Sequence, residues 1–111
     1  MLLRVKESVI ASGDTESDLV DLENVMIVGL IIPTIDNGTL TFKVAARAID
    51  TPVLLKSKAL TALTVSASTG GIAIGSDDLD ELSAYRYVQI VAGAAQTAER
   101  TFTWVTKVWT P

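Results

Sequence analysis

The chain has 111 residues, a formal charge of −4 and a hydrophobic fraction of 49 %, and it contains neither cysteine nor histidine. This length suits a single domain, and the missing residue types exclude disulfides, cysteine-based metal sites and histidine as general base or zinc ligand. The acidic balance, with only nine scattered Lys and Arg residues, argues against nucleic acid as a partner, because phosphate binding depends on clustered basic side chains.

The N-terminal third contains short apolar runs separated by turn residues, a pattern typical of strands. A first strand is expected at residues 5–10, within a segment 1–14 that is either an N-terminal arm or an edge strand, and a short extended piece is expected at residues 19–22. The run from Val25 to Ile32 is apolar throughout. It predicts a central strand buried on both faces, with Gly29 at a bulge or a close strand crossing.

The middle of the chain contains the clearest alternation. Residues 39–48 place Leu40, Phe42 and Val44 on one face and polar or small side chains on the other, which predicts a half-buried strand. A short strand is expected at residues 53–55. Two further strands, residues 61–68 and 72–74, are separated by Thr69-Gly70-Gly71, which predicts a hairpin.

The C-terminal third adds two strands, at residues 86–92 and 100–109, and Phe102 and Trp104 share one face of the second. We interpret these two aromatic side chains as core. With about eight short strands, no repeat and no linker, the sequence predicts one all-β domain over residues 1–111, an antiparallel β-sandwich of jelly-roll-like topology.

No residues predict catalysis, and no cofactor is implied. A nucleophile needs a positioned base, and no paired carboxylates stand out. The one acidic cluster contains Asp77, Asp78 and Asp80, which are weak candidates for Ca²⁺ ligands. We favour a simpler interpretation, in which Ser76 caps a single helical turn and the carboxylates stabilise its N-terminus.

Several apolar residues near the two ends of the chain are candidates for contacts with other proteins, namely Leu2, Leu3, Val5 and Trp109. Trp109 lies on the strand face opposite to Phe102 and is hard to bury within a small sandwich. The start of the chain lacks the apolar core of a signal peptide, and no segment is predicted to span a membrane. We therefore expect synthesis in, and retention by, a cytoplasm until assembly.

The sequence also resembles a group of small β-sandwich virion proteins of tailed bacteriophages. The similar segments, which cover most of the chain from about Glu16 to Trp109, are Ser17-Asp18-Leu19-Val20-Asp21-Leu22, Val28-Gly29-Leu30-Ile31-Ile32-Pro33, Gly38-Thr39-Leu40-Thr41-Phe42-Lys43-Val44, Tyr85-Arg86-Tyr87-Val88-Gln89-Ile90-Val91-Ala92-Gly93 and Ala98-Glu99-Arg100-Thr101-Phe102. The chain departs from this group at Val44-Ala45-Ala46-Arg47 and in its longer N-terminal segment.

This resemblance implies a non-enzymatic capsid decoration (cement) protein that is located in the virion. It would bind the major capsid protein or other virion proteins as a homo-oligomer, with a trimer favoured. Two alternatives stay open. One is a neck, tail or baseplate subunit, and the other is a carbohydrate-binding jelly-roll module that uses Tyr85, Tyr87 or Trp109.

Overall fold

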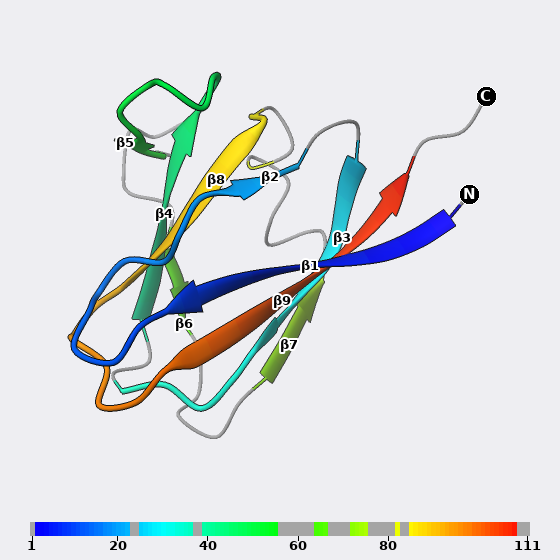
Figure 1. The fold of residues 1–111 in the computed structure, drawn as a ribbon. Coiled ribbons are helices and arrows are strands. Elements are labelled where there is room, and N and C mark those ends of the chain that lie inside the picture. Colours follow the sequence, from blue (N-terminus) through cyan, green and yellow to red (C-terminus); the bar gives the residue numbers. More distant parts are fainter. Residues whose placement is uncertain are drawn as a thin grey trace.

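The computed structural model describes residues 2–22, 25–36, 39–55, 64–66, 72–75, 82 and 85–108. These residues form two facing antiparallel sheets (Figure 1). The strands are β1 (Leu2–Ile10), β2 (Val20–Asp21), β3 (Val25–Ile32), β4 (Thr39–Ala45), β5 (Val53–Leu54), β6 (Thr64–Ser66), β7 (Ile72–Gly75), β8 (Tyr87–Ala92) and β9 (Arg100–Val108). The first strand begins three residues earlier than the sequence predicts.

The strand order is that of a jelly roll. One sheet has the order β1-β9-β3-β7, and in the other β2, β8 and β4 are neighbours. Both β5 and β6 pair with β4, at Lys43–Val44 and at Thr39–Thr41 respectively, while β8 pairs along the other edge of β4. Because β5 and β6 pair with different parts of the same edge of β4, together they take the place of a single strand in the sheet. Strand β1 pairs with β9, and β2 pairs with β8. This pairing of strands from the two ends of the order confirms the predicted jelly-roll-like sandwich.

The predicted hairpin across Thr69-Gly70-Gly71 is wrong. Strand β6 pairs with β4 in one sheet, whereas β7 pairs with β3 in the other. Glycine-rich turn residues allow the chain to reverse, but they do not determine whether the next strand pairs with the previous one. In a jelly roll this connection passes from one sheet to the other. The turn residues 67–71 themselves lie outside the described residues.

The core lies between the sheets, and the predicted core positions of Phe102 and Trp104 are confirmed, because neither has exposed surface. The Trp104 ring on β9 contacts the Phe42 ring on β4, with centroids 6.2 Å apart and planes tilted by 59°. This tilted arrangement is favoured by the ring quadrupoles. Strands β4 and β8 alternate as predicted, with buried side chains at every second position from Leu40 and from Val88.

Strand β3 is central, as predicted, but it is not buried on both faces. Leu30 and Ile32 are buried, whereas Met26 and Ile31 are each 49 % exposed. The second sheet covers only one face of the first, so a strand that is apolar at every position leaves half of its side chains outside. The predicted bulge is confirmed, because the pairing of β3 with β9 shifts register between Ile27 and Gly29.

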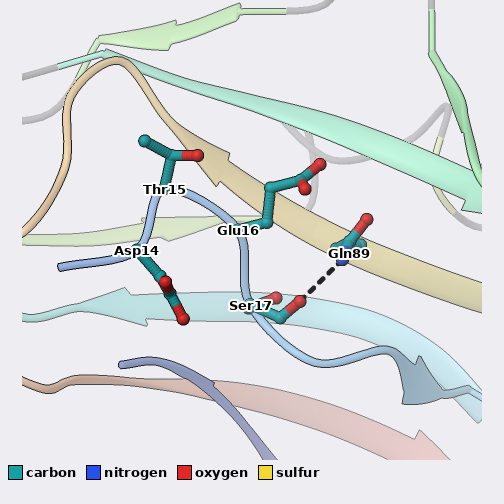
Figure 2. A pocket seen from close by; sticks show the side chains of 5 residues that line it. All are labelled: Asp14, Thr15, Glu16, Ser17 and Gln89. Carbon is teal, nitrogen blue, oxygen red and sulfur yellow. Dashed lines mark hydrogen bonds between the residues drawn. The ribbon is translucent and has the colours of Figure 1, made fainter. Parts of the chain in front are cut away.

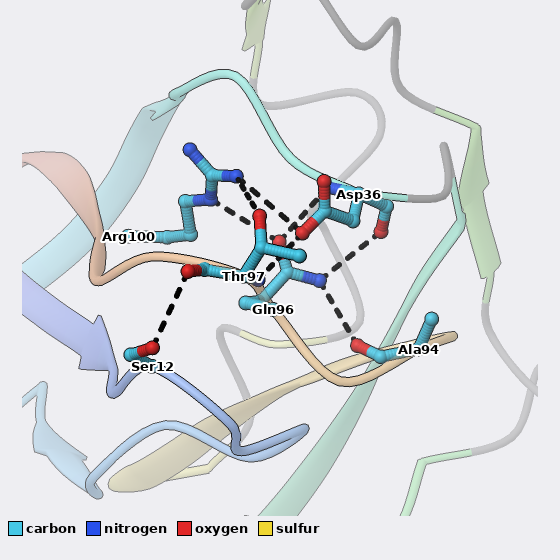
Figure 3. Close-up of polar contacts among 6 residues, drawn as sticks. All are labelled: Ser12, Asp36, Ala94, Gln96, Thr97 and Arg100. Atoms are coloured by element: carbon cyan, nitrogen blue, oxygen red, sulfur yellow. Dashed lines mark hydrogen bonds and ion pairs between the residues drawn. The ribbon is translucent and has the colours of Figure 1, made fainter.

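Three connections meet at one end of the sandwich around the side chain of Gln96, which is 2 % exposed (Figure 3). Its Oε1 accepts a hydrogen bond from the backbone N–H of Asp36 at 2.9 Å, and its Nε2 donates to the carbonyls of Asp36 at 3.1 Å and Ala94 at 2.9 Å. The backbone of Gln96 also bonds Gly13 and Asp14 in the β1–β2 connection. A buried amide with these partners fixes the three loops relative to one another.

Candidate functional site

The outer surface of the four-stranded sheet is apolar across its strands. Leu3 and Val5 on β1 are 62 % and 65 % exposed, and Met26 and Ile31 on β3 are each about half exposed. The strand register makes these side chains neighbours, because Leu3 and Met26 both lie opposite Lys107 on β9 and Val5 lies opposite Val105. We call this surface the apolar face. Its outward side chains are those of Leu3, Val5, Met26, Ile31, Ala73, Thr103, Val105 and Lys107, and the exposed Glu7 and half-buried Val9 on β1 lie on the same side of the sheet.

The outer surface of the other sheet is polar by comparison. Lys43 on β4 lies opposite Gln89 on β8, and Lys43 forms an ion pair with Glu16. The guanidinium of Arg86 binds the carboxylate of Asp21 through Nε and Nη2, at 3.1 and 3.2 Å. One solvated polar face is normal for an antiparallel sheet. An apolar outer face is not, and contiguous exposed apolar surface in a small domain marks contact with another molecule.

The alternation along β1 supports the same conclusion. Ser8 and Ile10 are buried and face the second sheet, so Arg4 and Lys6 point to that same side, while Leu3 and Val5 point outward. A strand that served only its own core would have the opposite pattern, with apolar residues inside and charged residues outside. From Leu3 to Lys6 the order is therefore inverted, whereas the next residue, Glu7, places its charge on the outer side as expected.

Of the predicted contact residues, Leu3 and Val5 lie on the apolar face. The backbone of Leu2 pairs with Val108, but its side chain lies outside the described part, as does the whole of Trp109. Sequence reasoning missed Met26 and Ile31, because in an uninterrupted apolar run no alternation shows which positions point outward. The candidate calcium ligands Asp77, Asp78 and Asp80 also lie outside the described residues.

A shallow hollow of about 300 Å³ lies elsewhere on the molecule, lined by Asp14, Thr15, Glu16, Ser17 and Gln89 (Figure 2). Within it the Nε2 of Gln89 donates to the backbone carbonyl of Ser17 at 2.7 Å, and the carboxylate of Glu16 is engaged by Lys43. The five described residues that line the hollow are polar, and none of them offers an aromatic ring on which a sugar could stack.

Neither of the two tyrosines that could contact a glycan is among these lining residues. Tyr85 is 37 % exposed, and the ring of half-buried Tyr87 is covered by the guanidinium of Arg86, 5.3 Å from the ring centroid. A smaller exposed apolar set, formed by Ile49, Val53 and Leu54, lies at the β4–β5 connection of the other sheet. This set has three large exposed apolar side chains, whereas the apolar face has four that extend over two strands on either side of β9.

Among the described residues, no three or more Asp or Glu side chains are grouped as a metal site would require, and no helix there has the length and apolarity to cross a membrane. Comparison with protein-family models, with curated proteins and with solved structures gives no match.

Proposed function

We propose that this protein is a non-enzymatic structural subunit of a bacteriophage virion, a capsid decoration protein that stabilises the head by binding capsid subunits through the apolar face. The observation that carries the proposal is the exposure of Leu3, Val5, Met26 and Ile31 on one sheet surface, whereas the outward positions of β4, an interior strand of the other sheet, are Thr39, Thr41 and Lys43. Covering this surface with capsid protein buries apolar area between subunits, which contributes roughly 25 cal/mol per Å² in favour of association, against the entropy lost on binding.

The fold and the sequence resemblance support the same proposal. Jelly rolls are used repeatedly as virion building blocks, although the fold alone does not define a function. The resemblance to small tailed-phage virion proteins implies an oligomer at a symmetry axis. The proposal therefore includes a homotrimer bound at a three-fold axis, with the major capsid protein as partner and closed symmetry that limits the assembly.

The test uses purified virions of the phage that encodes the chain. We expect the protein in these particles, and we expect particles prepared without it to release their DNA at a lower temperature. Adding back the purified protein should restore the release temperature. Absence of the protein from virions would refute the proposal, and a reconstruction that locates it in the neck, tail or baseplate would replace the decoration role with that of a subunit there.

Two matched variants test the surface itself. Ile31→Glu places a charge on the apolar face, in a strand interior to its sheet, whereas Thr41→Glu places the same charge on the polar outer face of the other sheet. We expect Ile31→Glu to lose binding to particles in a co-sedimentation assay, because the carboxylate would be buried without a partner. Thr41→Glu should bind as the wild type does. Equal binding by both variants would show that another surface is used.

A further inference from the structure

The first strand has one edge that no described strand covers. Strand β1 pairs with β9 over nine residue pairs without a register shift, and it is the terminal strand of its sheet. In an antiparallel ladder, the N–H and C=O groups of successive residues point alternately to the two sides of the strand. Half of the backbone groups of β1 therefore point away from β9.

The contacts of Val9 identify which half this is. Its N–H donates to the Oδ1 of Asp18 at 2.8 Å, and its C=O accepts from the N–H of Asp18 at 3.3 Å, so Val9 faces the free edge. By alternation, Glu7, Val5 and Leu3 face this edge too. Asp18 closes the edge only at its Ile10 end, where Ile10 also forms a bridge with Ser17. From Leu3 to Glu7, no described strand takes up these groups.

The side chains beside this open edge differ on its two faces. Leu3, Val5 and Glu7 are exposed on the outer face, which is apolar from Leu3 to Val5 and carries the charge of Glu7 at the Ile10 end of the open edge. Arg4 and Lys6 lie on the inner face, and none of the ion pairs between described residues includes either of them. A strand added here would place its own alternate side chains opposite these two rows. The complementary strand is apolar on one face and acidic on the other.

The same charges argue against a second copy of β1 as the added strand. An antiparallel pair of β1 strands centred on Val5 would align all of the open edge, and it would place Arg4 of each copy opposite Lys6 of the other. Like charges directly opposite each other are destabilising. Registers shifted toward Ile10 are blocked, because the edge groups of Val9 already bind Asp18.

We infer that the open edge of β1, from Leu3 to Glu7, binds an extended segment of a partner protein in which acidic and apolar residues alternate. The segment continues the sheet through backbone hydrogen bonds to Leu3, Val5 and Glu7. Its carboxylates lie opposite Arg4 and Lys6, and its apolar side chains extend the apolar face. The inference rests on the proposed function only in taking the partner to be a virion subunit.

The test uses short synthetic peptides in which valine alternates with glutamate, and a control series in which lysine replaces glutamate. With the full-length protein, the glutamate peptide should shift the NMR signals of the Leu3, Val5 and Glu7 amides and slow their hydrogen exchange. The lysine peptide should bind about tenfold more weakly, because two cross-strand charge pairs become repulsive. Equal effects of the two peptides, or no effect of either, would overturn the inference.

Two sets of variants sharpen this test. Val5→Pro removes an N–H that the fold does not use, so the protein should stay folded but lose the peptide, whereas Val5→Thr keeps the N–H and should retain it. The double variant Arg4→Glu/Lys6→Glu should prefer the lysine peptide. If capsid binding depends on Ile31 while peptides fail to bind, the proposed function stands and the edge inference fails. If the protein binds the peptide but is absent from virions, the edge inference stands and the proposed function fails.

Discussion

The indole of Trp104 on β9 donates a hydrogen bond from Nε1 to the Oγ of Ser8 on β1, at 2.9 Å, and both side chains are completely buried. The bond joins neighbouring strands inside the core. It lies where the inward-facing side chains of β1 change from the charged Arg4 and Lys6 to the buried Ser8 and Ile10. It satisfies the only polar atom of the largest core side chain. Buried N–H groups without an acceptor are destabilising, so position 8 requires a side chain that can accept a hydrogen bond from the indole.

We therefore predict that Ser8→Ala lowers the free energy of unfolding by roughly 1–3 kcal/mol, because it leaves the indole N–H buried and unpaired. Urea denaturation monitored by tryptophan fluorescence measures this change. The variants Trp104→Phe and Ser8→Ala/Trp104→Phe complete a double-mutant cycle. If the two single effects simply add, the hydrogen bond does not contribute to stability.

A second prediction concerns Gln96, whose amide ties together the connections at one end of the sandwich. Gln96→Leu keeps a similar volume but leaves the Asp36 N–H without its acceptor, and we expect a loss of about 1–3 kcal/mol in unfolding free energy. Hydrogen exchange at the Asp36 amide should become faster. The same replacement at half-buried Gln89, which donates one hydrogen bond to Ser17, serves as control. Equal losses for both variants would contradict the special role of Gln96.

The third prediction is a pH dependence that arises from Asp36. The backbone N–H of Thr97 donates to its Oδ2 at 2.6 Å, and this bond, a hydrogen bond from the Thr97 side chain and the charge of Arg100 together hold the pKa of Asp36 below its ordinary value of 3.8. A carboxyl whose pKa is lower in the folded state stabilises the fold above its unfolded pKa. That contribution is lost as the pH falls through the lower, folded value.

We therefore expect the melting temperature of the wild-type protein to fall more steeply below about pH 4 than that of Asp36→Asn, which has no proton to gain. Above that pH the wild type should be the more stable protein. Differential scanning calorimetry across this range makes the comparison. Parallel curves for the two proteins would show that Asp36 does not contribute to acid denaturation.

The fourth prediction compares two glycines. Gly13 has a φ of +89°, in the region that residues with a Cβ rarely adopt. Gly75 on β7 has no positive φ, and the space around an added Cβ is open there. Gly13→Ala should destabilise the protein by about 1 kcal/mol or more, while Gly75→Ala should be neutral or slightly stabilising. Thermal melting of both variants tests this. A neutral Gly13→Ala would show that the turn adopts another conformation at little cost.

Sequence patterns by themselves determined the fold class and most of the strands. In β4 and β8, apolar and polar residues alternate with a period of two, so the sequence shows both the strand and its buried face. The core positions of Phe102 and Trp104 follow from the same alternation in β9. Composition alone excluded histidine and cysteine chemistry.

The tertiary structure decided which surfaces are covered and which strands pair. The run in β3 is apolar at every position, so no alternation shows which side chains point inward. Only the position of the second sheet shows that Met26 and Ile31 remain outside. The pairing of β6 and β7 depends on how the chain crosses between sheets, which a local turn signal does not contain. The alternation in β1 is visible in the sequence, but its meaning depends on which side the second sheet occupies. Only that placement turns Leu3 and Val5 into surface residues and leaves Arg4 and Lys6 beside an open strand edge.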